Sequence, residues 1–435
     1  MSQKELVLLR EKIYRCLRDL ETPEGINASG KDEVFGCIFG RDSFITILKI
    51  LKANKTKHDH DLLQMCKKSL LTHCSLQGTQ ENIESGEQPG KFIHEYRVDK
   101  YERLVNRPLP WYIYPDKILR NYDSIDATPL GLIALYKYWE TTKDSEFLKS
   151  VLPSVKHALQ WIIRYGDMDD DYLIEYELPR SRKFGGLVVQ SWADSLPSLA
   201  DKEGNLPSYP IAPVEVQAIS YVALMLWSDY FLEHEKKSKG GKVLSRFATQ
   251  LKKTFEEKFL LKSNGLWYLA QALNGEKNPV PTITSNPLLC MWASYEKNGK
   301  RYSIIDEVYI TDMVKRAFQP DLFVPHAGIR TMSALSPTFN PNENSYHNGS
   351  FWPMLNGLIV EGLDNFGFTQ EASLLTHAML QPIHHFDSPI ELYIEKEGDY
   401  LPYKSMYGQS SCMNQAWSAA AIYDVLLGLT APAAF

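Results

Sequence analysis

The sequence has no strong excess of charge of one sign and no clustering of its basic residues. Its 435 residues carry a formal net charge of −6 at pH 7, with 47 Lys and Arg against 53 Asp and Glu. Binding to a phosphate backbone or an anionic membrane requires a basic stripe or patch on the surface. We therefore expect neither nucleic acid nor a membrane as a partner.

Long apolar runs are also missing. No segment offers the roughly 18 uncharged apolar residues that a bilayer-spanning helix needs. The first ten residues, MSQKELVLLR, place charges where a signal peptide would have its apolar stretch. The sequence therefore predicts a cytoplasmic protein.

Cysteine is scarce and irregularly spaced. The six cysteines form no Cys-x-x-Cys pair, which argues against a zinc ribbon or a redox centre. The acidic run from Asp167 to Asp171 imitates a calcium loop, but Tyr172 stands where that loop needs glycine. We expect free thiols, no cofactor and no metal.

The apolar residues recur mostly with the 3.6-residue period of an α-helix. Hydrophobic residues make up 44% of the chain, enough for a large core. Strand signals are few, the clearest being Leu266–Ala270 after the turn Asn264–Gly265. About twelve helices are predicted, at residues 2–20, 42–53, 59–75, 126–142, 146–165, 213–234, 241–259, 285–296, 305–317, 350–364, 369–382 and 413–429.

Several predicted helices come in pairs with short connectors, which force the two helices to be antiparallel neighbours. Six such hairpins arranged in a ring make an all-α (α/α)6 barrel with long rim loops. A chain of this length could form two or three domains, but repeated hairpins can run this far around one core. We expect a single catalytic domain over residues 1–435.

Long connections separate the pairs, and connections of this length are usually functional when they are not disordered. They run over residues 76–125, 167–212, 318–349 and 383–412, and they are rich in carboxylates and aromatic side chains, among them Trp111, Tyr112, Tyr114, Trp192, Tyr346 and Tyr393. Aromatic rings can pack on the flat C–H faces of sugars, and carboxylates and amides can form hydrogen bonds with sugar hydroxyls. We expect these rim loops to form a sugar-binding pocket.

Two carboxyl groups stand out as candidates for glycosidic cleavage, which needs one proton donor and one ionised partner. Asp194 lies in VVQSWADS, where apolar residues exclude water and raise the pKa of the carboxyl; a helix N-cap is the alternative. Glu391 follows a proline among apolar residues, where a charge is costly unless it is used. A buried structural ion pair is the alternative for Glu391.

Arg41 and Asp42 are adjacent at the start of an apolar helix and are expected to form an ion pair. Such a pair can hold neighbouring sugar hydroxyls, while Asp42 could equally be a first-turn acid stabilised by the helix dipole.

In these motifs the sequence resembles the amylo-α-1,6-glucosidase part of glycogen debranching enzymes and their bacterial relatives, within the glucoamylase-like (α/α)6 hydrolases. The resemblance rests on eight motifs in the family's order: GRDSF at 40–44, IDATPL at 125–130, SWADS at 191–195, PIAPVEVQA at 210–218, GIRT at 328–331, SYHNGSFWP at 345–353, PIELY at 389–393 and QAWS at 415–418.

The resemblance implies an inverting hydrolase that releases glucose from an α-glucoside, most simply an α-1,6-linked oligosaccharide. Asp194 would then be the general acid and Glu391 the general base, with Arg41 and Asp42 holding the non-reducing sugar. It further implies a pocket lined by Asp126, Trp192, Glu215, Gln217, His347 and Trp417.

Alternatives remain at the level of the substrate. Glu95 lies in a charge-dense segment, residues 84–97, that could contact an acceptor sugar or select a small or anionic aglycone, as in the related glucosyl- and mannosylglycerate hydrolases. A phosphorolytic enzyme would use cations for phosphate, with Arg97, Arg180, Arg182 and Lys183 as the candidates, and Glu391 would then have no role. A carbohydrate-binding protein without catalysis is the remaining alternative, and the sequence predicts no oligomeric state.

Overall fold

The computed structural model describes residues 1–201, 203–235 and 238–431. Its α-helices are α1 (Gln3–Arg18), α2 (Gly40–Thr56), α3 (His60–Ser75), α4 (Glu102–Val105), α5 (Ala127–Thr142), α6 (Ser145–Trp161), α7 (Val214–His234), α8 (Lys239–Lys258), α9 (Leu289–Trp292), α10 (Glu307–Ala317), α11 (Pro353–Asn365), α12 (Thr369–Phe386) and α13 (Ala416–Thr430).

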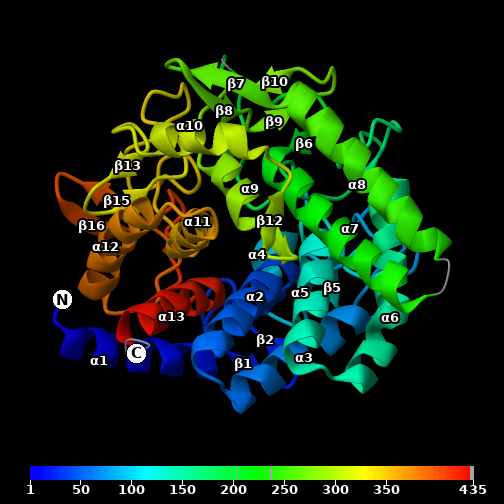
Figure 1. Ribbon diagram of the computed structural model, residues 1–435, viewed down its shortest axis with the longest axis horizontal. Helices are drawn as coiled ribbons and strands as arrows, with labels where there is room; N and C mark the ends of the chain where they lie inside the picture. Colours follow the sequence, from blue (N-terminus) through cyan, green and yellow to red (C-terminus); the bar gives the residue numbers. More distant parts are fainter. Residues whose placement is uncertain (202, 236–237, 432–435) are drawn as a thin grey trace.

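Alternate helices of the chain close a ring. Each of α2, α5, α7, α9, α11 and α13 contacts the next, and α13 returns to α2. The helices between them, α1, α3, α6, α8, α10 and α12, form the outer layer, so that the colours of Figure 1 run once around the ring and bring α1 beside α13. This arrangement confirms the predicted (α/α)6 barrel.

The two layers differ in how their apolar residues are distributed. The inner helices α5, α7 and α13 are apolar on every side, because the ring covers one face and the outer layer covers the other. The outer helices α1, α6 and α8 each carry a single apolar stripe. The position of a helix in the barrel therefore follows from its own sequence.

One predicted helix, residues 285–296, is wrong over most of its length. A 3-10 turn at Asn286–Leu288 leads into the single turn of α9, and residues 294–303 form the hairpin of β11 (Ser294–Lys297) and β12 (Lys300–Ser303). Asn298 and Gly299 both have positive φ, 53° and 72°. This Asn-Gly pair favours a tight hairpin turn, which here outweighs the helical periodicity.

The strands are short and belong to the connections, as the few strand signals predict. They are β1 (Glu21–Thr22), β2 (Gly25–Ile26), β3 (Ile38–Phe39), β4 (Glu95–Arg97), β5 (Leu119–Asn121), β6 (Ala212–Pro213), β7 (Leu260–Ser263), β8 (Leu266–Leu269), β9 (Ala272–Leu273), β10 (Pro279–Val280), β11, β12, β13 (Phe323–Val324), β14 (Gly328–Ile329), β15 (Tyr393–Lys396) and β16 (Asp399–Pro402). The predicted strand after Asn264–Gly265 is β8, which pairs antiparallel with β7.

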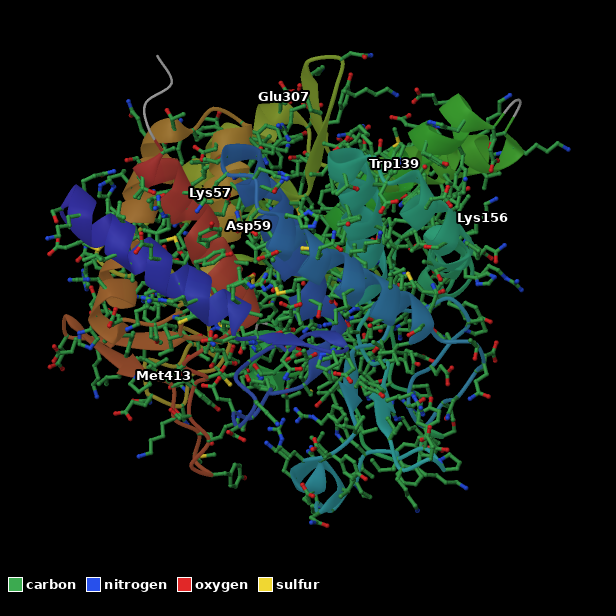
Figure 2. The ribbon with its side chains drawn as sticks, turned by 90° about the horizontal axis from the view of Figure 1, so that it is seen from below. Lys57, Asp59, Trp139, Lys156, Glu307 and Met413 are labelled. Carbon is green, nitrogen blue, oxygen red and sulfur yellow. The ribbon has the colours of Figure 1, made fainter. Side chains whose placement is uncertain are left out.

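The long connections all lead into the start of an inner helix, whereas short ones such as residues 57–59 and 143–144 follow its end. Figure 2 shows the consequence: the helices, with Trp139 near the end of α5, occupy one half of the molecule, and the connections, with Met413 just before α13, gather at the other. Any site built by these connections therefore lies over the starts of the inner helices.

The helices and the cysteines bear on the expected absence of membrane spans and of disulfides. Within the three described ranges, no helix combines the length and the apolar character needed to cross a bilayer. The six thiols are unpaired, and those of Cys66, Cys290 and Cys412 are buried.

A buried lysine ties three inner helices together below the site. The Nζ of Lys49 on α2 lies 2.8 Å from Glu361 Oε2 on α11 and also contacts the carboxylate of Asp424 on α13. Its side chain is 1% exposed. Lys52, one turn further along α2, lies 3.6 Å from the same two carboxylates but is 36% exposed.

Replacing Lys49 by Met should lower the free energy of unfolding by about 3–5 kcal/mol, because it leaves two largely buried carboxylates with only the more distant and more exposed Lys52 as counter-charge. Lys52→Met is the matched control and should cost less than about 1 kcal/mol, since water screens that contact. Urea unfolding followed by circular dichroism measures both values. Equal losses in the two variants would contradict the importance of the buried contact.

Candidate active site

A cavity of about 290 Å³ opens over the starts of the inner helices. Arg41 and Asp42 from α2 and Trp417 from α13 lie at its base, and the connections supply its walls. Its lining consists of Phe35, Phe39, Arg41, Asp42, His94, Glu95, Arg103, Leu104, Trp111, Leu187, Trp192, Asp194, Tyr346, His347, Trp352, Glu391, Tyr403, Gln409, Gln415 and Trp417. Residues from several distant segments of the chain, between Phe35 and Trp417, therefore meet at one place.

Most of the predicted site residues belong to this lining. The structure brings together Arg41, Asp42, Glu95, Trp192, Asp194, His347, Glu391 and Trp417. Of the aromatic residues expected in the rim loops, Trp111 and Tyr346 also line the cavity, whereas Tyr112, Tyr114 and Tyr393 do not.

Asp194 presents one carboxylate oxygen to a guanidinium and keeps the other unengaged. Its Oδ2 accepts a hydrogen bond of 3.0 Å from Nη1 of Arg41, and across the described ranges Oδ1 has no hydrogen-bond partner. Burial raises the pKa of Asp194 to about 6, against the opposing effect of Arg41. Ser195, not Asp194, holds the N-cap position of the following 3-10 turn, and it makes no side-chain cap hydrogen bond, so the N-cap interpretation of Asp194 is wrong.

Glu391 is held at both oxygens. Its Oε1 accepts a hydrogen bond of 2.5 Å from the Tyr346 hydroxyl, and Oε2 accepts one of 2.9 Å from the Cys412 N–H. Burial raises the pKa of Glu391 to about 7, although both hydrogen bonds favour the ionised form. No cation among the described residues pairs with Glu391, so the structural ion-pair interpretation is wrong.

The expected ion pair between Arg41 and Asp42 does not form. Neighbouring residues of a helix point about 100° apart and do not face each other. Arg41 instead donates from Nε to Asp126 at 2.6 Å, from Nη1 to Asp194, and from Nη2 to the Ser191 carbonyl at 2.9 Å. This buried guanidinium thus joins α2 to the start of α5 and to the loop that carries Asp194.

Asp42 faces the cavity with capacity to accept a further hydrogen bond. Its Oδ1 accepts a 3.0 Å hydrogen bond from Nε2 of Gln415, and its side chain is almost fully buried. Burial raises the pKa of Asp42 to about 7. A carboxyl group of this kind can bind a sugar hydroxyl as acceptor or, when protonated, as donor.

An aromatic wall stands beside the two carboxyl groups. The rings of His347 and Trp352 stack 4.7 Å apart, and Trp192 meets both edge-on. Trp417 lies edge-on to Trp352 at 5.9 Å. Burial lowers the pKa of His347 well below its ordinary value, so the imidazole is neutral and the wall is uncharged.

Three predicted lining residues lie behind the cavity. Asp126 accepts the hydrogen bond from Arg41, and Gln217 holds the carbonyls of Ile174 and Pro213. Glu215 is 1% exposed in the first turn of α7, where burial raises its pKa to about 7. Their motifs start the inner helices, but their side chains support the wall and do not line it.

Other lining residues were not predicted from the sequence. Trp352 lies in the same motif as His347, and Gln415 lies in the same motif as Trp417, so these two motifs could have indicated them. Arg103, on the one-turn helix α4, and Gln409 lie in connections without a motif. Only the fold shows that these two reach the cavity.

A lysine partly neutralises the acidic run after α6. Carboxylate oxygens of Asp167, Asp169 and Asp171 lie within 4.8 Å of one another. The Nζ of Lys277 lies 3.1 Å from both Asp169 and Asp171 and also contacts Glu175. An internal ammonium group therefore supplies the positive charge that a metal ion would bring.

Solved structures share this fold at low sequence identity. The GH63 mannosylglycerate hydrolase from Thermus thermophilus, in complex with glucose, is 13% identical with a TM-score of 0.66, covering 95% of this chain and 99% of that chain. A wild-type glycosidase is also 13% identical, with a TM-score of 0.61 and 99% of both chains covered. No curated protein sequence matches the chain.

The sequence itself decides the family. The family model for amylo-alpha-1,6-glucosidase matches residues 100–424, which is most of the chain and includes the loops that carry Asp194 and Glu391. With the barrel and the cavity described above, this match shows that the chain is a glycoside hydrolase and belongs to the amylo-alpha-1,6-glucosidase family.

Proposed function

We propose that the protein is an inverting hydrolase that releases glucose from α-1,6-linked oligosaccharides, with Asp194 as the general acid and Glu391 as the general base. The observation that carries this proposal is that both carboxyl groups line one cavity and differ in their hydrogen bonding. Inversion needs one carboxyl group that donates a proton to the leaving oxygen and another that activates water on the opposite side.

The hydrogen bonds of Glu391 suit the base. A carboxylate that accepts hydrogen bonds at both oxygens is stabilised in its ionised form and fixed in orientation. Tyr346 and Cys412 supply these two bonds. In its ionised form Glu391 is therefore oriented to take a proton from an attacking water molecule. Burial places its pKa, about 7, above that of Asp194, about 6, so the assignment of the base rests on the two fixed oxygens and on the family and not on the order of the two pKa values.

The hydrogen bonds of Asp194 suit the acid. Arg41 fixes Oδ2, while Oδ1 is unengaged and can carry the proton toward a glycosidic oxygen. Arg41 also favours the ionised form that remains after the proton has left. Burial opposes this effect and keeps the pKa of Asp194 near 6, so the proton is still available in weakly acidic solution.

The base of the cavity suits one terminal glucosyl unit. Asp42 and Gln415 offer hydrogen-bonding groups, and Trp417 offers an aromatic face. Because the inner helices close the barrel below these residues, a chain cannot pass through the site. Release of single glucose units from a chain end follows, and the family favours an α-1,6-linked unit.

Hydrolysis is favoured over phosphorolysis by the cations near the site. A phosphorolytic enzyme needs several cations that are free to bind phosphate, and among the described lining residues Arg103 is the one arginine without an ion pair. Arg97 instead pairs with Glu95, and Arg182 pairs with Asp123 at 2.7 Å. A phosphate in the position of the base would also leave Glu391 without a role.

A second candidate substrate is a glucoside with a small anionic aglycone. Arg103 lines the cavity, its Nη2 donates 3.2 Å to the Val34 carbonyl, and its guanidinium lies 5.4 Å from the Phe35 ring. Within the described part of the chain it forms no ion pair. A guanidinium without an ion pair can bind the carboxylate of a substrate through two parallel hydrogen bonds. The mannosylglycerate hydrolase has also been solved in complex with Tris and D-glycerate.

A substrate panel with glucose detection tests these two candidates. Isomaltose, panose and limit dextrin should release glucose faster than maltose, trehalose or glucosylglycerate, and Arg103→Met should change their hydrolysis less than about threefold. A preference for glucosylglycerate that falls about 10-fold or more in Arg103→Met, through loss of a charged hydrogen bond, would establish the second candidate. No glucose from any of these compounds would contradict both.

Asp194→Asn should reduce kcat on the best substrate by about 10²- to 10⁴-fold, because an amide keeps the shape of the side chain but cannot donate the proton. Asp170→Asn is the matched control, since it makes the same chemical change at an exposed position in the same connection. Circular dichroism checks that both variants are folded. Activity of Asp194→Asn near the parental rate would show that Asp194 is not the acid.

A further inference from the structure

A second cavity, of about 250 Å³, lies behind the segment that carries Asp194. The charge-dense segment 84–97 divides between the two cavities. His94 and Glu95 line the catalytic one, whereas this one is lined by Gly86, Glu87, Gln88 and Lys91. Its full lining is Glu81, Asn82, Ile83, Gly86, Glu87, Gln88, Lys91, Asp123, Tyr165, Glu177, Pro179, Arg182 and Gln190. In volume it is close to the catalytic cavity.

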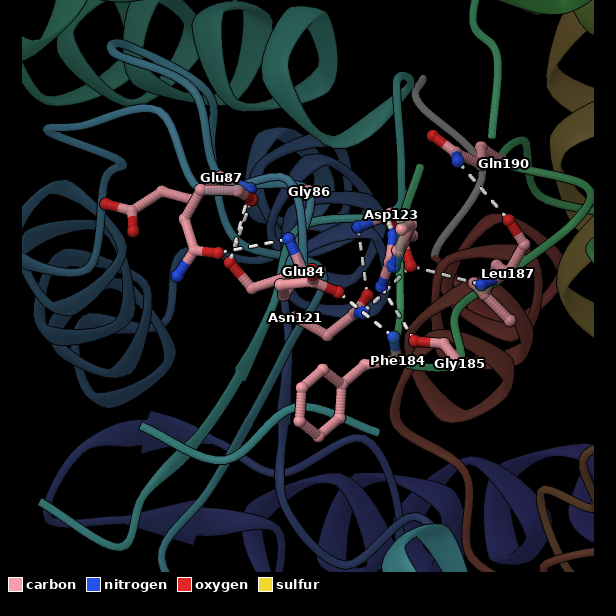
Figure 3. Close-up of polar contacts among 12 residues, drawn as sticks. Glu84, Gly86, Glu87, Asn121, Asp123, Phe184, Gly185, Leu187 and Gln190 are labelled. Atoms are coloured by element: carbon pink, nitrogen blue, oxygen red, sulfur yellow. Dashed lines mark hydrogen bonds and ion pairs between the residues drawn. The ribbon is translucent and has the colours of Figure 1, made fainter. Parts of the chain in front are cut away.

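The inner wall of this cavity is held by buried polar contacts. Asp123 and Arg182 form an ion pair of 2.7 Å, with side chains 1% and 3% exposed. Asp123 also accepts a hydrogen bond of 3.1 Å from the Leu187 N–H, and Arg182 donates 2.8 Å to the Gly185 carbonyl. Figure 3 shows these contacts beside Glu84, which binds the N–H groups of residues 183 and 184. Buried ion pairs and hydrogen bonds therefore hold the inner wall of this cavity in place.

Lys91 is a buried cation in this lining whose donors are mostly unused. The side chain is 4% exposed, and its Nζ donates to the Gly86 carbonyl at a long 3.4 Å. In the described ranges no carboxylate lies within ion-pair distance of it; its nearest aromatic neighbour, Trp161, has its ring centre 5.5 Å away. Burial lowers the pKa of Lys91 to about 8. An ammonium group has three N–H donors, so a buried one needs further acceptors from the cavity.

The charges of the lining select against ions of either sign. Four carboxylates, those of Glu81, Glu87, Asp123 and Glu177, outnumber the two cations Lys91 and Arg182, which disfavours an anion. The ammonium of Lys91 disfavours a metal cation. A neutral polyol suits both groups, because each hydroxyl can donate to a carboxylate and accept from an ammonium or an amide.

We propose that this cavity is a second carbohydrate site that binds a neutral hexose of the glucose type. Lys91 and the amides of Asn82, Gln88 and Gln190 donate to its hydroxyls, the carboxylates accept from them, and Tyr165 provides an aromatic face. Leu187 lines the catalytic cavity and Gln190 lines this one. A bound sugar therefore touches the back of the loop whose front carries Asp194.

Equilibrium dialysis of the full chain against labelled D-glucose counts the sites. The inference rests on the proposed function only in the choice of glucose as the probe. Lys91→Met keeps the apolar stem but removes the donors, and it should weaken this site by about 10-fold or more. Lys149→Met, an exposed lysine on α6 outside both cavities, should leave binding unchanged.

The outcomes separate this inference from the proposed function. Two glucose sites in the parent and one in Lys91→Met support both, and one site that Lys91→Met removes supports this inference alone. Glu177→Ala, at an exposed position of the lining, should weaken the same site and serves if Lys91→Met does not fold. An unchanged site count in these variants, or tighter Lys91-dependent binding of D-gluconate than of glucose, would overturn the inference.

Discussion

The buried guanidinium of Arg41 is the contact on which the candidate site depends. It binds Asp126 at the start of α5, and it binds the Asp194 carboxylate and the Ser191 carbonyl in the connection before α7. A buried charge is tolerated only when it is paired and its donors are satisfied. The loop that carries Asp194, the proposed proton donor, is therefore held against two inner helices by one side chain, which fixes the position of Asp194 relative to the cavity.

The topology of the barrel explains why the site lies at this end. Each inner helix begins after a long connection, so Arg41, Asp42 and Trp417, in the first turns of α2 and α13, meet under the loops that carry Asp194 and Glu391. Loops form the walls of the cavity, so substitutions in these loops can alter substrate specificity without altering the ring of inner helices. Arg103 on the short helix α4 is one such wall residue, and its guanidinium has no carboxylate partner among the described residues.

Much of this fold could be predicted from the sequence, because helical periodicity marks most of the helices and short connectors pair them as antiparallel hairpins. The prediction failed at residues 294–303, where the Asn298–Gly299 turn makes a hairpin. At the site, Asp194 and Glu391 could be selected because apolar neighbours make their charges costly. The Arg41–Asp42 pair was wrong because adjacency in the chain does not give contact on a helix, and Arg103 and Gln409 depend on loop geometry that no local pattern encodes.

The stereochemistry of the product tests the central claim most directly. An inverting site keeps its two carboxyl groups roughly 6.5–9.5 Å apart to admit a water molecule, whereas a retaining site uses one of them as a nucleophile. Proton NMR of the anomeric signals in the first minutes of hydrolysis distinguishes the two. With Glu391 as the base, an α-glucoside must yield β-glucose first; α-glucose as the first product would contradict the account.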